Sequence, residues 1–236
     1  MALPKNIRPE YSTKLPSTGQ RIKYQPFTVK EEKVLVLAAE SSDPDEVTNA
    51  ITNVLRNCIT SPSDLRIDQL ALFDIEYLFL KTRAKSAGEK IDIRVTDPND
   101  EDFTVDHEIN IDKIGVKRNE NHTNLIDLNE NCKIKMRYPD ISFFNEGIDL
   151  SSIQTQIQLM ARCVDQVIVD EDEVIDRSEM TDNEVEEWLE ELTTEQFKKI
   201  AEFFQTMPKL SHSITVKNTN TGKDFTIVLE GLQDFF

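Results

Sequence analysis

The 236-residue sequence has little of what most catalytic and metal-binding motifs require. It contains three cysteines, three histidines and six glycines. The glycines form no G-x-G-x-x-G or G-x-x-x-x-G-K pattern, which excludes the common phosphate-binding loops. The cysteines and histidines are scattered, without the spacing that holds a metal ion. The sequence therefore predicts no cofactor, no metal and no recognisable catalytic site.

Long apolar runs are absent as well. No run approaches the roughly 18 to 20 residues that cross a bilayer, and the N-terminal segment lacks the apolar core of a secretion signal. Three widely separated cysteines, Cys58, Cys132 and Cys163, are typical of reduced core residues rather than of disulfides. We therefore expect a protein of a reducing compartment with no membrane partner.

Positive charge is scarce. The sequence has 27 Lys and Arg against 44 Asp and Glu, a formal charge of −17. Because a nucleic-acid partner requires a clustered basic face, we expect no nucleic-acid binding. Residues 165–191 contain thirteen acids and one base, whereas residues 1–38 contain seven bases and three acids. The charge is thus polarised along the chain.

The hydrophobic periodicity predicts an α+β fold. We expect a helical N-terminal half with a leading hairpin, a small central antiparallel sheet, and C-terminal helices followed by a β-hairpin. The corresponding parts are residues 1–89, 90–148 and 149–236, a division that is also compatible with one continuous domain.

The N-terminal half carries clear start signals. Thr28 with Glu31 forms a capping box, and Asp43 ahead of Pro44 marks the start of a second helix. A third helix, expected over about residues 64–85, is apolar on more than one side and should be the central core helix. The first helix is expected to bury an apolar face made of Val34, Leu35, Leu37 and Ala38.

The second half is expected to begin with about four strands of one small sheet between residues 90 and 139, and to continue with a helix over 149–168. Thr181 with Glu184 and Thr193 with Gln196 start two further helices. A hairpin ends the chain. We expect residues 193–236 to form one compact element, in which the helix stripe packs on the inward row of the hairpin. Those two rows are Phe197, Ile200 and Phe204, and Phe225, Ile227 and Leu229.

Six segments carry a family resemblance: residues 15–33, 73–88, 122–124, 136–139, 193–212 and 231–236. They resemble the baseplate hub proteins of T-even-like contractile-tailed bacteriophages. The resemblance implies a non-enzymatic tail protein that acts in assembly of the central hub, as a hub component or as an assembly chaperone. It also implies other baseplate hub or tail proteins as partners. The implied locations are the host cytoplasm during assembly and the virion tail baseplate.

Two features are candidates for partner binding. The acidic segment contributes Glu186, Glu187, Glu190 and Glu191, which form either a solvated face or a docking surface. The terminal pair Phe235 and Phe236 either closes the core of its own domain or anchors in a neighbouring subunit.

Two other classes of function remain open. A small enzyme with an unrecognised site would need a concave cluster around His107 or His122 that contains a strongly perturbed acid or base. An acidic protein that mimics nucleic acid or binds a basic partner would need residues 170–191 to project as an ordered charged surface.

Overall fold

The chain folds into two compact units. The computed structural model describes residues 7–41, 43–141, 152–170 and 173–232. Unit 1 comprises residues 1–117 and 209–236, and unit 2 comprises residues 118–208. Unit 2 is therefore an insertion within the sequence of unit 1. These boundaries differ from the three-part division expected from the sequence.

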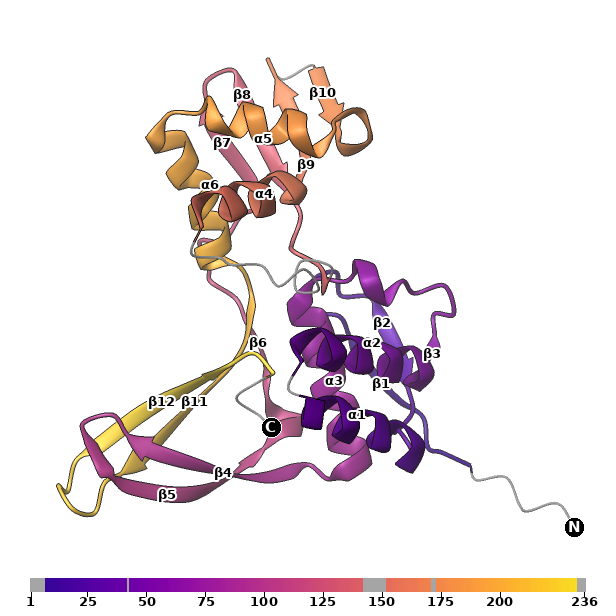
Figure 1. Cartoon of the computed structure of the whole chain (residues 1–236), viewed down its shortest axis with the longest axis vertical. Coiled ribbons are helices and arrows are strands. Elements are labelled where there is room, and N and C mark those ends of the chain that lie inside the picture. The colour runs from indigo at the N-terminus through magenta and orange to yellow at the C-terminus, as the bar shows by residue number, and fades with distance from the viewer. Residues whose placement is uncertain (1–6, 42, 142–151, 171–172, 233–236) are drawn as a thin grey trace, which may run out of the picture. The chain divides into compact units, whose positions relative to one another are not determined.

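The expected α+β class is confirmed, because helices and several small antiparallel sheets alternate along the described chain. Figure 1 shows the helices and strands of each unit. The leading hairpin is present as β1 (Tyr11–Lys14) and β2 (Arg21–Tyr24), and β2 also pairs with β3 (Ile59–Ser61).

Three helices follow in unit 1: α1 (Val29–Ser41), α2 (Pro44–Cys58) and α3 (Leu72–Ala87). Asp43 caps α2 by accepting a hydrogen bond from the Asp45 N–H at 2.9 Å. The helix α3 begins later than expected, because the 3-10 helix η1 (Ile67–Gln69) precedes it. Its apolar side chains lie in the interior, with Ile75, Leu78 and Phe79 almost fully buried, which confirms α3 as the core helix.

The helix α1 begins as expected but buries a different face. Thr28 donates its backbone N–H to the Glu31 carboxylate at 2.9 Å, which forms the cap. Ala38 is buried, but Val34 is 43% exposed and Leu37 is 55% exposed. The expected apolar face is therefore wrong at these two positions. The physical reason is that the side packed toward α2 runs through the capping residue Glu31 and Ala38, which lie two turns apart.

Two long hairpins complete unit 1. One consists of β4 (Lys90–Asp97) and β5 (Asp100–Asn110), and the other of β11 (Lys209–Lys217) and β12 (Asp224–Glu230). Figure 1 shows them side by side, and Asn218 joins their ends by donating to Asp97 at 2.8 Å and Asp100 at 3.0 Å. The strand β6 (Gly115–Lys117) pairs with the other edge of β11. The core beneath these strands contains residues from α3, β5, β11 and β12: Leu80, Ala84, Ile109, Leu210, Ile214 and Leu229.

Unit 2 has one antiparallel sheet with helices on one face (Figure 1). Its strands, in the order β10-β9-β8-β7, are β7 (Leu125–Asn129), β8 (Cys132–Met136), β9 (Val164–Val169) and β10 (Glu173–Asp176). Its helices are α4 (Ile153–Cys163), α5 (Asp182–Glu190) and α6 (Thr194–Thr206). The core between them includes Ile134, Met160, Val167, Leu189 and Phe203.

Three expectations about the second half need correction. The strands between residues 90 and 139 form, but they are divided among three sheets rather than gathered in one. The helix expected over 149–168 ends at Cys163, and the chain continues as β9. Residues 193–236 do not form one element, because the core of unit 2 contains Ile200 whereas the core of unit 1 contains Leu229.

Candidate interaction surface

The helix α5 carries an acidic face whose geometry is fixed at its start and along its buried side. Thr181 accepts from the Glu184 N–H at 3.3 Å, and the Glu184 carboxylate accepts from the Thr181 N–H at 2.9 Å. The Thr181 hydroxyl also donates to the Glu184 carboxylate at 2.7 Å, and this bond, together with the one from the Thr181 N–H, lowers the pKa of Glu184. Val185 and Leu189, one turn apart, bury the opposite side of the helix in the core of unit 2. The acids therefore stand on an ordered helix rather than on a loose connector.

The four acids predicted from the sequence lie at this outer surface. Glu187 and Glu190 are exposed on α5, Glu191 is exposed at its C-terminal cap, and Glu186 is half-buried. Within the part of the chain that the structure describes, no ion pair is recorded for any of the four. The base in this segment, Arg177, instead donates to Asp182 and, at 2.7 Å, to the Met180 carbonyl. These four acids, which make no ion pair with the described residues, are available to an external cation or basic surface.

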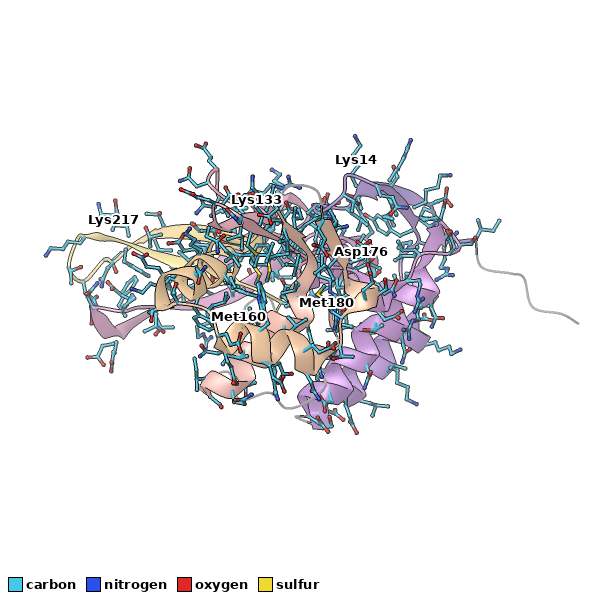
Figure 2. All side chains as sticks on the ribbon, turned by 90° about the horizontal axis from the view of Figure 1, so that it is seen from above. Lys14, Lys133, Met160, Asp176, Met180 and Lys217 are labelled. Carbon is cyan, nitrogen blue, oxygen red and sulfur yellow. The ribbon has the colours of Figure 1, made fainter. Side chains whose placement is uncertain are left out.

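The charge of the molecule is concentrated in unit 2. Residues 118–208 contain 21 acids and 8 bases, a formal charge of −13, whereas the two segments of unit 1 contain 23 acids and 19 bases, a charge of −4. In unit 1, Lys14 and Lys217 stand at strand ends and point away from the ribbon (Figure 2). The polarity predicted along the sequence thus corresponds to a difference between the two units.

The other predicted pair, Phe235 and Phe236, lies outside the described residues.

The sheet of unit 2 has a polar face opposite its helices, as expected for strands that alternate. Lys133 pairs there with Asp127 at 3.4 Å, and Lys135 pairs with Asp165 at 3.0 Å. These charges neutralise one another across neighbouring strands, so this face is less acidic than α5.

His122 is a packing residue in unit 2. Its Nδ1 lies 3.0 Å from the Thr206 hydroxyl, and its Nε2 lies 3.0 Å from the Tyr138 hydroxyl. Thr206 already donates to the Glu202 carbonyl at 2.7 Å, so its oxygen accepts from Nδ1–H and the Tyr138 hydroxyl donates to Nε2. Burial, aided by Arg118, lowers the pKa of His122. A neutral ring that joins α6 to the chain after β8 is therefore the favoured state.

His107 and His212 lie on the two hairpins of unit 1. Burial lowers the pKa of His212, and the charges of Lys117 and His107 lower it further. Among the described residues, no group of three or more His, Cys, Asp or Glu side chains is arranged to hold a metal ion. The three cysteines are free thiols; Cys58 and Cys163 are buried, and burial raises the pKa of Cys163 to about 12. Such thiols stay protonated, which suits a packing role.

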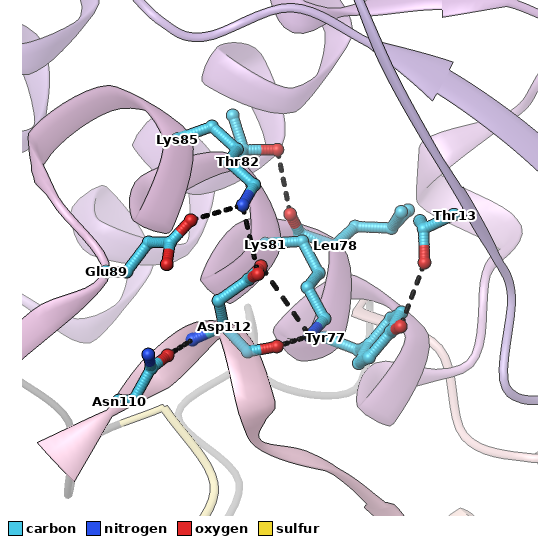
Figure 3. Close-up of polar contacts among 9 residues, drawn as sticks. All are labelled: Thr13, Tyr77, Leu78, Lys81, Thr82, Lys85, Glu89, Asn110 and Asp112. Atoms are coloured by element: carbon cyan, nitrogen blue, oxygen red, sulfur yellow. Dashed lines mark hydrogen bonds and ion pairs between the residues drawn. The ribbon is translucent and has the colours of Figure 1, made fainter.

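A polar network anchors α3 in unit 1, and the sequence did not predict it (Figure 3). Lys85 donates to the Asp112 carboxylate at 2.9 Å and also to Glu89, and these contacts raise its pKa. Lys81 donates to the Asp112 carbonyl, and Tyr77 bonds to Thr13 at 2.8 Å. Because each cation here is already paired, the network holds α3 to β1 and to the segments that flank the β4–β5 hairpin. The helical spacing of Tyr77, Lys81 and Lys85 is the signal that was available in the sequence.

Glu76 on α3 is a carboxyl with a strongly shifted pKa. Burial raises its pKa to about 7, and a hydrogen bond from the Leu232 N–H at 3.3 Å opposes that shift. Its recorded partner is a backbone amide, with no second titratable group in the same contact. This hydrogen bond connects the segment after β12 to α3.

The comparison with family models settles which family this is. The model described as T4 bacteriophage base plate protein matches residues 8–236, nearly the whole chain. The chain belongs to this family. The role of this base plate protein is therefore structural, within the tail baseplate of a bacteriophage. The comparison with curated proteins gave no match, and neither did the comparison with solved structures. No described helix of this base plate protein has the length and apolar character that crossing a membrane requires.

Proposed function

We propose that this base plate protein acts in assembly of the central hub of the baseplate, as a hub component or an assembly chaperone, without catalysing a reaction. Family membership supports the baseplate role. The resemblance of segments such as 193–212 to hub proteins supports the hub. The partners are other baseplate hub or tail proteins that present a basic surface.

The acidic face of α5 is the observation on which the proposed docking rests. Glu186, Glu187, Glu190 and Glu191 stand on a capped helix or at its end, make no ion pair with the residues that the structure describes, and belong to a unit with a formal charge of −13. A surface of one sign accelerates encounter with a surface of the other sign, and exposed charges at a contact rim contribute more to association rate than to residence time.

The test is the reversal of four charges in the full chain: Glu186→Lys, Glu187→Lys, Glu190→Lys and Glu191→Lys. The variant should associate with hub proteins from infected cells more slowly, and its binding should depend less on salt. The fold should be little changed, because exposed ion pairs contribute about 0 to 1 kcal/mol each. Binding with unchanged rate and salt dependence would contradict docking through this face.

A matched control changes net charge equally in unit 1. It reverses four exposed acids on the hairpins: Asp92, Glu101, Asp102 and Asp224. If both variants lose binding equally, total charge rather than the α5 face is responsible.

A second experiment separates the two forms of the proposal. Purified tails contain a hub component, whereas a chaperone is found only in complexes from infected cells. A protein absent from both would contradict the hub role while leaving the family assignment intact.

A further inference from the structure

The outer side of α1 is apolar at positions where a surface helix is normally polar. Val29 is 79% exposed, and Val36, two turns later, is 51% exposed; Leu37 lies beside Val36 and is also exposed. The opposite side of the helix, through Glu31 and Ala38, is the side that is buried. This exposed stripe is not the remainder of an incompletely packed core, because α1 already has a buried face.

The exposed stripe also carries two charges at symmetrical positions. Lys33 lies three residues before Val36, and Glu40 lies three residues after Leu37. At about 100° per residue, Lys33 and Glu40 fall on the same side of the helix, together with Val29, Val36 and Leu37. Both side chains are exposed, and no ion pair is recorded for either within the described chain.

This arrangement is complementary to itself in one orientation. If a second α1 lies antiparallel to the first, centred on the Val36–Leu37 pair, each Lys33 faces the Glu40 of the other copy. Val36 of one copy then packs on Leu37 of the other. In a parallel arrangement Lys33 would face Lys33, so like charges would oppose each other.

We propose that α1 is a homodimer contact, in which two copies of this chain pair their α1 helices antiparallel about a twofold axis. The contact is isologous, because the same patch serves both copies and closes the assembly at two. One helix from each copy makes an interface smaller than that of a standard stable complex, so the dimer is weak. It forms at the high local concentration that an assembling structure provides.

Sedimentation of the full chain tests the proposal. The 27.2 kDa chain should shift toward twice that mass as concentration rises to about 1 mM. Leu37→Glu should remain a monomer over the same range. The control Val228→Glu replaces an exposed apolar residue of β12 and should dimerise like the unchanged chain. Circular dichroism of each variant establishes that it is folded.

Charge exchange tests the orientation. Lys33→Glu alone sets two carboxylates against each other at each charged contact, and Glu40→Lys alone sets two ammonium groups against each other. Each single variant should therefore be a monomer. An equimolar mixture of the two should form a heterodimer, because each of its two charged contacts then joins a carboxylate of the Lys33→Glu chain to an ammonium group of the Glu40→Lys chain. The double variant should dimerise like the unchanged chain.

A chain that stays monomeric at about 1 mM overturns the proposal. Dimerisation that survives Leu37→Glu assigns the contact to another surface and overturns it equally. Neither result affects the proposed docking through α5, which is measured on a different helix and with a different partner.

Discussion

At the scale of single residues, Glu76 gives unit 1 a dependence on pH. Its pKa in the folded protein is about 7, against 4.5 for the unperturbed group. Between these values the folded chain holds a proton that the unfolded chain has released, so stability falls as pH rises from about 4.5 to 7. The stabilisation is fully present below that window and absent above it.

Glu76→Gln should remove this dependence, because Gln stays neutral and still accepts from the Leu232 N–H. At pH 8 the variant should be more stable than the unchanged chain by roughly 1 to 3 kcal/mol, whereas at pH 5 the two should be similar. Urea unfolding followed by circular dichroism across this range measures the difference. The exposed Glu46→Gln serves as the control, and an equal pH response in all three proteins would contradict the assignment.

Phe203 and Phe204 are neighbours in sequence but differ in burial. Phe203 is 2% exposed in the core of unit 2, whereas Phe204 is half-buried against it. Phe203→Ala should cost about 3 to 5 kcal/mol, and Phe204→Ala should cost less. Fluorescence of Trp188, the sole tryptophan of the chain, reports unfolding of the same core. A larger loss of stability for Phe204→Ala than for Phe203→Ala would contradict this order of burial.

At the scale of elements, the cap of α5 determines how firmly the acidic face is held. Thr181→Ala removes the hydroxyl that accepts from the Glu184 N–H and should cost about 1 kcal/mol, whereas Thr181→Ser should restore most of that loss. Trp188 lies on this helix, so its fluorescence during urea unfolding measures both variants. Equal stability of Ala and Ser at this position would show that the hydroxyl contributes nothing.

Helix starts that carry a capping signal could be predicted, because a cap depends on neighbours in sequence, whereas α3 lacks a side-chain cap and begins later than expected. The reciprocal hydrogen bonds of Thr181 with Glu184 and of Thr193 with Gln196 are both present. The boundary between α4 and β9 could not be predicted, because neither Cys163 nor Val164 is a helix-breaking residue. Val164 and Val167 also fit a helical stripe as well as they fit a buried strand.

Tertiary partners were harder to infer than elements. The apolar stripe of α6 and the inward row of β12 each present one apolar side, so either could cover the other. The two nevertheless pack in different units. A period identifies which side of an element is apolar but not what covers it. The acids of α5 can be recognised in the sequence because charge is visible there, and their role in docking stays a prediction. Glu76 was missed because its burial depends on residues far along the chain.

At the scale of the whole molecule, the insertion predicts unequal responses to truncation. Unit 2 is continuous in sequence and has its own core, so residues 118–208 alone should fold, with cooperative unfolding reported by Trp188. Residues 1–208 should retain that transition but lose the one from unit 1. The reason is that Leu210, Ile214 and Leu229 would be missing from the unit 1 core. Intact unit 1 in the 1–208 chain would contradict this division.

The strand β11 lies between β6, which precedes the inserted unit, and β12, which follows it. During translation all of unit 2 is synthesised before β11 and β12, the strands that complete this sheet. Unit 2 can therefore fold before unit 1 is complete, which reverses the usual order in which the earlier part of a chain folds first. A chain whose translation stops within unit 2 therefore contains an incomplete unit 1 with exposed apolar surface. Chaperones and proteases can distinguish such a chain from the full-length protein.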